Sequence, residues 1–260
     1  MSAPVLRACS LLAVLALSGT SPPAHSDSAV AIIERVKPSV VAVGTYQRTR
    51  SPGFQFRATG FVVGNGTLIA TNAHALPSAL DNEHREVLAI AIPGAGGEPA
   101  VREARQIAAD TGTDLALLKV GGQPLPALEL AGADGAKEGQ TVLFTGFPIG
   151  GVLGIFPATH RGMISAITPI AIPPPTAANL DVHLYRRLAD GAFPVLQLDA
   201  TAYPGNSGSP VYDAETGEVL GIVNMVFVKG SKETALTQPS GITYAIPAEH
   251  LKKLLDKAHD

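Results

Sequence analysis

Three short segments of this 260-residue sequence carry side chains suited to nucleophilic catalysis. A serine hydroxyl is a weak nucleophile at its ordinary pKa, so it needs a nearby base and a third group that fixes the tautomer of that base. His74 is the candidate base, Asp114 the orienting carboxylate and Ser207 the nucleophile. The segments that contain them are Thr71–Ala75 (TNAHA), Thr113–Leu118 (TDLALL) and Pro204–Pro210 (PGNSGSP). Together they predict acyl transfer through a covalent serine intermediate.

The order of the three residues along the chain separates one class of hydrolase from the others. Histidine comes first and serine last, which is the order of the chymotrypsin-type β-barrels and differs from that of subtilisins and α/β-hydrolases. An esterase of the α/β-hydrolase class would also need Gly-x-Ser-x-Gly, and Ser209 occupies the place of its last glycine. The order therefore favours a peptidase over an esterase.

The serine loop also contains the backbone groups that acyl transfer requires. Backbone N–H groups aimed at the oxyanion of a tetrahedral intermediate contribute about 3–4 kcal/mol per donor. Gly205 and Ser207 are the two expected donors of this oxyanion hole. A glycine suits the first position because its backbone can turn the N–H inward, and Gly208 leaves room beside the nucleophile.

Other polar residues have simpler interpretations. Asp110 is the nearest rival of Asp114, but it precedes Thr111 and Gly112, so we expect it to stabilise a turn. The remaining histidines show no paired spacing typical of a zinc site, and we predict neither a metal nor a cofactor. These histidines include His160, His183, His250 and His259.

Short β-type runs must position the candidate residues. Runs rich in Val, Ile, Thr and Phe are separated by Gly, Pro, Asn or Asp, which favours an all-β sandwich or barrel. Phe54 and Phe56 flank Gln55 in an expected loop. The predicted strands are Ser39–Thr45, Thr59–Val63, Thr67–Thr71, Val87–Ile92, Leu115–Val120, Thr141–Thr145, Gly162–Ile167, Val195–Leu198, Val219–Val228 and Ile242–Ile246.

A stretch rich in Gly, Pro and Ala at about 121–139 is the expected connection between two β units. The first unit, about 39–120, contains His74 and Asp114, and the second, about 140–247, contains Ser207. Short helices are expected at each end, at 27–36 and 248–257, where Pro38 stops the first and Pro247 opens the second.

Composition excludes several classes of protein. Hydrophobic residues make up 46% and charged residues 16% of the chain, which excludes a disordered protein. The formal net charge is −3, with no block of like charges, so no basic face for nucleic acid is expected.

The N-terminal segment 1–26 has the pattern of a secretory signal. Arg7 precedes the apolar run Ala8–Leu17, which is shorter than the about 20 residues that span a bilayer. Small residues follow at Ala24 and Ser26, so we expect cleavage after Ser26 and no stable membrane insertion afterwards. Cys9, the single cysteine, is then removed, and a protein without disulfides fits a periplasmic or secreted bacterial-type location.

Six segments in order resemble the HtrA/Deg branch of chymotrypsin-fold, trypsin-like serine proteases. The resemblance implies an all-β fold of two six-stranded antiparallel β-barrels, cofactor-free hydrolysis of proteins or peptides, and the three roles given above. Members of that branch usually carry PDZ domains after the protease, and we expect none here. The segments are Ala58–Leu76, Thr111–Val120, Phe144–Gly150, Ala158–Ile167, Leu198–Val211 and Gly241–Pro247.

The same resemblance assigns a specificity pocket. In that fold the residue six before the nucleophile lies at the pocket base, which is Thr201 here, and Asn224, Met225 and Val226 line one wall. These residues carry no charge, so an unpaired Arg, Lys, Asp or Glu of a substrate would be costly to bury. We expect cleavage after small or medium aliphatic residues. A latent or non-catalytic member with a chaperone-like or binding role remains the alternative, and the oligomeric state is left open.

Overall fold

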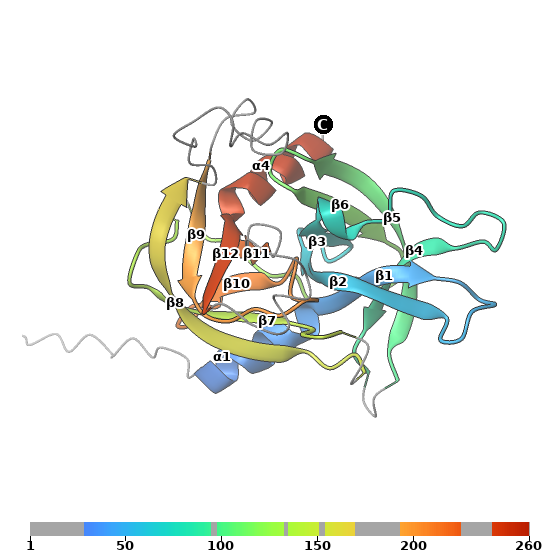
Figure 1. Cartoon of the computed structure of the whole chain (residues 1–260), viewed down its shortest axis with the longest axis horizontal. Helices are drawn as coiled ribbons and strands as arrows, with labels where there is room; N and C mark the ends of the chain where they lie inside the picture. The colour runs from blue at the N-terminus through green and yellow to red at the C-terminus, as the bar shows by residue number, and fades with distance from the viewer. Residues whose placement is uncertain are drawn as a thin grey trace, which may run out of the picture.

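The computed structural model describes residues 29–94, 98–132, 135–150, 154–169, 193–224 and 241–259. Its strands form two closed six-stranded antiparallel barrels, which confirms the predicted fold class (Figure 1). The expected signal segment 1–26 and most of the Pro-rich loop 168–193 lie outside the described residues. No helix among the described residues is long and apolar enough to cross a membrane.

The first barrel contains the strands that lead to His74 and Asp114. Its neighbours run in the order β1-β2-β3-β6-β5-β4, and β1 closes the barrel by pairing with β4. The apolar run of β1 is buried on both faces, because Val41 and Val43 fill the barrel while Val40 and Ala42 face outward into a second cluster. The strands are β1 (Val40–Tyr46), β2 (Phe54–Val63), β3 (Leu68–Asn72), β4 (Val87–Ile92), β5 (Ala100–Asp110) and β6 (Leu115–Val120).

The second barrel contains the serine loop. Its strands neighbour one another in the order β10-β11-β12-β9-β8-β7, and the barrel closes through antiparallel pairing of β10 with β7. Phe144, Ile164, Leu196 and Leu198 are fully or almost fully buried in its interior. The strands are β7 (Thr141–Gly146), β8 (Ala158–Pro169), β9 (Pro194–Asp199), β10 (Pro210–Asp213), β11 (Val219–Val223) and β12 (Ile242–Pro247).

A shared apolar cluster joins the two barrels. Phe61 and Leu117 of the first barrel pack in one cluster with Phe147 and Tyr212 of the second. The helices α1 (Ala29–Val36) and α4 (Ala248–His259) add apolar side chains to it, and α4 lies against β5, β6, β11 and β12 (Figure 1). Burial of this cluster fixes the two barrels relative to each other, which a site built from both requires.

The structure corrects the predicted strands in several places. β5 is absent from the prediction because its sequence, AVREARQIAAD, shows little apolar alternation, in keeping with side chains that are all at least partly exposed. β10 is also absent, since it has only four residues directly after the serine loop. Phe54 and Phe56 lie in β2 and not in a loop, where they pair with Tyr46 and Gly44. The helix α4 extends to His259, beyond the predicted end at 257.

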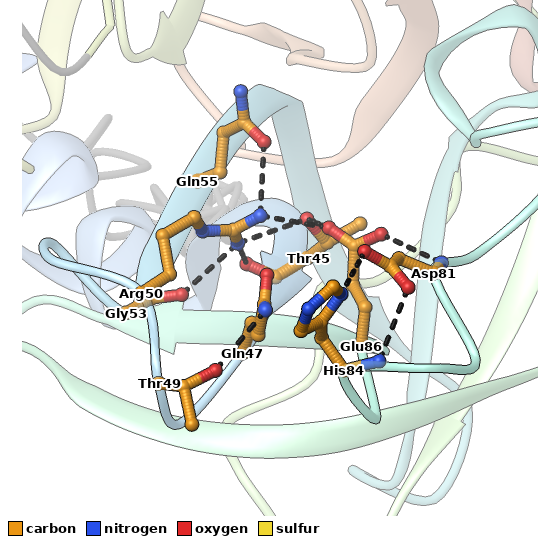
Figure 2. Close-up of polar contacts among 9 residues, drawn as sticks. All are labelled: Thr45, Gln47, Thr49, Arg50, Gly53, Gln55, Asp81, His84 and Glu86. Carbon is orange, nitrogen blue, oxygen red and sulfur yellow. Dashed lines mark hydrogen bonds and ion pairs between the residues drawn. The ribbon is translucent and has the colours of Figure 1, made fainter.

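A polar cluster ties the β1–β2 loop to the segment that follows His74 (Figure 2). The Arg50 guanidinium donates to Glu86 Oε1 at 2.8 Å and to the Gly53 carbonyl oxygen at 3.0 Å. Glu86 also accepts from the Thr45 hydroxyl at 2.6 Å and from the Asp81 amide at 3.1 Å. The Thr45 hydroxyl, then the Asp81 amide and Arg50, lower the pKa of Glu86 to about 2.

Candidate active site

His74 and Asp114 meet at the ends of two paired strands. β3 pairs with β6 through Asn72 and Leu115, so the short 3₁₀ turn at Ala73–Ala75 lies beside the residue that precedes β6. The backbone N–H of His74 donates to Asp114 Oδ1 at 2.8 Å, and His74 Nδ1 lies 2.6 Å from Asp114 Oδ2. These two contacts fix the imidazole ring relative to the carboxylate.

Asp114 is held from several directions. Its own carbonyl oxygen accepts from the Ala73 amide and from Asn72 Nδ2, both at 3.1 Å. Its φ of +58° is left-handed, a conformation that aspartate tolerates better than most residues. From the second barrel, Asn224 Nδ2 donates to Asp114 Oδ2 at 2.7 Å. The carboxylate oxygen nearest the imidazole is therefore also bound across the junction of the two barrels.

Asp110, the rival carboxylate, has a different function. Its Oδ1 accepts from the backbone N–H groups of Gly112 at 2.9 Å and Thr113 at 3.3 Å. These bonds stabilise the turn between β5 and β6, as predicted for a residue in that position. The structure therefore pairs His74 with Asp114 and assigns Asp110 to the turn.

The loop that carries Ser207 begins with a tight turn. The Asn206 amide donates to the Tyr203 carbonyl oxygen at 2.9 Å, with Pro204 and Gly205 at the two central positions. Gly205 has φ +103°, and a proline followed by a glycine at positive φ is the signature of a type II turn. A β-carbon on Gly205 would lie 2.3 Å from the Phe147 carbonyl oxygen, so only glycine fits.

Ser207 lies where the two barrels touch. Its carbonyl oxygen accepts from the Thr59 amide of β2 at 2.9 Å, and the residue is 7% exposed. A β-carbon on Gly208 would lie 2.1 Å from the Thr59 carbonyl oxygen and 2.7 Å from Thr71 Oγ1. Because Thr71 is three residues before His74 on the same stretch of chain, this packing brings the serine loop beside the segment that carries the histidine.

The predicted pocket residues have separate outcomes. Thr201 is partly exposed and lies between two residues that the Thr243 hydroxyl holds. That hydroxyl donates to the Ala200 carbonyl oxygen at 2.7 Å and accepts from the Ala202 amide at 3.0 Å. Asn224 directs its amide to Asp114, a contact that the sequence interpretation did not foresee. Met225 and Val226 lie outside the described residues, so their pocket role stays a prediction.

His160 lies close to the serine loop without a charged partner among the described ion pairs. Its ring stacks on Phe144 at a centroid distance of 4.8 Å and approaches the Tyr203 ring at 6.2 Å. Burial lowers the pKa of His160.

Within the described ranges, no group of three His, Cys, Asp or Glu side chains is placed to hold a metal ion.

Comparison with known proteins identifies a family. The family model described as a trypsin-like peptidase domain matches residues 58–222. A "Probable periplasmic serine endoprotease DegP-like" of Halomonas elongata is 29% identical over 83% of this chain and 37% of its own length. Another protein of that name, from Ectopseudomonas mendocina, is 29% identical over 78% of this chain and 36% of its own length. "Serine protease HTR4" of Bos taurus is 29% identical, with shares of 88% and 41%. The chain thus spans well under half the length of these relatives.

Proposed function

We propose that this chain, which belongs to the trypsin-like peptidase domain family, is a serine endopeptidase that uses His74, Asp114 and Ser207. The observation that carries the proposal is the double contact of His74 with Asp114, at 2.8 and 2.6 Å. The Ser207 loop is bound to β2 and packs against β3, the strand that leads to His74. A base, its orienting carboxylate and a serine thus come from adjoining segments.

The proposed reaction has two halves. Asp114 accepts a hydrogen bond from Nδ1–H of His74. The other ring nitrogen, Nε2, is then free to take the Ser207 hydroxyl proton. Ser207 Oγ then bonds to the substrate carbonyl carbon, the C–N bond breaks, and His74 returns the proton to the leaving amine. In the second half, His74 takes a proton from water, whose oxygen attacks the acyl carbon. The ester bond between that carbon and Ser207 Oγ then breaks, and His74 returns the proton to Oγ, which releases the acid and restores the Ser207 hydroxyl.

The backbone N–H groups of Gly205 and Ser207 are the proposed donors to the oxyanion. Two features support this assignment for Gly205. Its left-handed φ of +103° is a conformation that few other residues adopt, and no β-carbon fits at its position. Each such donor is worth about 3–4 kcal/mol of transition-state stabilisation.

We further propose that the substrate residue before the cleaved bond is a small or medium aliphatic one. Thr201 carries no charge to pair with Arg or Lys, and Met225 and Val226 supply apolar side chains without a basic group for Asp or Glu. An extra methylene in an apolar pocket changes binding by only about 1–3 kcal/mol, so the preference is modest.

Proteins or peptides exported from the cytoplasm are the proposed substrates. The signal-like segment 1–26 and the word "periplasmic" in the names of the bacterial relatives support action in the periplasm or outside the cell. The absence of a block of basic residues in the sequence argues against nucleic acid as a partner.

Casein hydrolysis by the purified protein tests the proposal. Ser207→Ala and His74→Ala should each abolish hydrolysis, because members of such a set act as a unit. Ser165→Ala, which changes an exposed serine on β8, should retain activity. Degradation of casein by Ser207→Ala at the wild-type rate would show that another residue is the nucleophile.

A further inference from the structure

Thr59 of the first barrel holds both residues that donate to the proposed oxyanion. Its hydroxyl donates to the Gly205 carbonyl oxygen at 2.7 Å, and its backbone N–H donates to the Ser207 carbonyl oxygen at 2.9 Å. Thr59 is fully buried, so water does not compete for these bonds. One residue of β2 therefore contacts the loop on either side of Asn206.

The direction of the Thr59 hydroxyl is fixed by a third partner. The Phe147 amide donates to Thr59 Oγ1 at 3.1 Å, so the oxygen accepts there and its single proton is left for Gly205. The Thr59 carbonyl oxygen in turn accepts from Thr71 Oγ1 at 2.8 Å. Each polar atom of Thr59 thus has a partner, which leaves the residue one orientation.

These bonds fix both peptide planes that meet at Gly205. The Pro204 carbonyl oxygen accepts from the Ile149 amide at 2.7 Å, and in a trans peptide the N–H of Gly205 points the opposite way. The following peptide is held at its carbonyl by the Thr59 hydroxyl and at its N–H by the Tyr203 carbonyl oxygen. Gly205 has the wide backbone freedom of a glycine, so its conformation depends on such external bonds.

We infer that Thr59 is a positioning residue, whose hydroxyl holds the Gly205 carbonyl so that the Gly205 N–H is presented to the oxyanion. The inference rests on the proposed function. A side chain of the first barrel would then hold an oxyanion donor of the second barrel in place. The rate of the chemical step would therefore depend on how the two barrels dock.

The test compares Thr59→Val with Thr59→Ser. Valine has the shape of threonine without the hydroxyl, and leaves the Gly205 carbonyl and the Phe147 amide unpaired, whereas serine keeps both bonds. For a peptide containing a bond that the wild-type protein cuts in casein, Thr59→Val should lower kcat at least tenfold with little change in KM. The loss should not exceed the about 10²–10³-fold that removal of a whole oxyanion donor costs. Thr59→Ser should recover most of kcat.

Thr145→Val is the matched control for stability. Thr145 is equally buried and its hydroxyl also has two partners, Thr159 Oγ1 at 2.8 Å and Tyr212 Oη at 2.7 Å, but none in the serine loop. The Thr145→Val variant should have a lower melting temperature than the wild type but a kcat within twofold of it. Inhibition by a peptide aldehyde, whose adduct with the serine carries an oxyanion, should weaken in Thr59→Val in parallel with kcat. Inhibition by an uncleaved peptide should not change.

The outcomes separate this inference from the proposed function. If the wild-type protein hydrolyses the peptide and Thr59→Val does so at the same rate, the inference is contradicted while the proposed function stands. Equal losses of kcat in Thr59→Val and Thr145→Val contradict it too, because they would indicate a general effect of stability. A wild-type protein that hydrolyses no peptide contradicts the proposed function and the inference with it. If Thr59→Val does not fold, Thr59→Ala carries the same comparison, since it adds no atom against the Phe147 amide.

Discussion

Gly208 and Gly139 form a matched pair that separates backbone strain from close packing beside the proposed nucleophile. Both have left-handed backbone, with φ of +84° at Gly208 and +85° at Gly139. A β-carbon at Gly208 would lie 2.1 Å from the Thr59 carbonyl oxygen, whereas one at Gly139 would have nothing within 4 Å. Alanine therefore carries the same conformational cost at both positions and adds a clash only at Gly208.

The cost of left-handed backbone and the cost of the clash can be estimated separately. Left-handed backbone costs a non-glycine residue about 1–2 kcal/mol, which applies to both variants. The clash at Gly208 is with backbone of a paired strand, so strand or loop must shift, and overpacking of this kind costs a further ~1–3 kcal/mol. Gly139→Ala should thus lower the free energy of unfolding by about 1–2 kcal/mol, and Gly208→Ala by about 2–5 kcal/mol.

Urea unfolding followed by circular dichroism measures both free energies, provided that the slopes of the transitions agree. Casein hydrolysis at a temperature where both variants are folded gives the second readout. Gly208→Ala should lose activity because the shift moves Ser207 relative to Thr59, and Gly139→Ala should keep it. Equal losses of stability in the two variants would refute the close approach of the serine loop to β2.

Three further predictions concern charge and chemistry. Glu86, whose pKa of about 2 lies below its ordinary 4.5, stabilises the fold above pH 4.5 and loses that contribution as the pH falls toward 2. Its side chain is 13% exposed, so solvent screening reduces the effect. In urea unfolding, Glu86→Gln should lower the free energy of unfolding by about 1–2 kcal/mol at pH 7 and by little at pH 2.5. A difference between wild type and variant that does not change with pH would contradict this. Asp114→Asn should lower kcat by about 10⁴-fold, as loss of the orienting carboxylate does elsewhere, and a larger loss in Asp110→Asn would reverse the assignment. A peptide library should show Val, Ala or Leu before the cut, and dominance by Arg or Lys would exclude Thr201 as the pocket base.

Local sequence patterns predict the strands and site residues whose positions depend on a single strand or loop. β1, β3 and β6 are almost wholly buried, and their continuous apolar runs made them visible as strands. His74 and Asp114 follow or precede two of these strands, so their approach was predictable once β3 and β6 were expected in one unit. β5 is not predicted, because its side chains are all exposed or partly exposed and give no such run.

Contacts between the barrels were beyond the reach of local patterns. Thr59 is separated from Gly205 by 146 positions, and Asn224 from Asp114 by 110. Which side chains meet over such distances depends on how the shared cluster around Phe61 and Phe147 docks the barrels. The family resemblance therefore predicts a place in the pocket wall for Asn224 but not its bond to Asp114, and the sequence shows Thr59 only as part of a strand.

Covalent labelling of the purified protein with an organophosphonate, followed by peptide mass spectrometry, tests the central proposal most directly. Such a probe bonds to a serine that a neighbouring base has activated. We predict a single adduct on Ser207 that is lost in His74→Ala, while Ser165, an exposed serine, stays unmodified. No adduct on Ser207, or an adduct whose rate is unchanged in His74→Ala, would contradict the proposed triad.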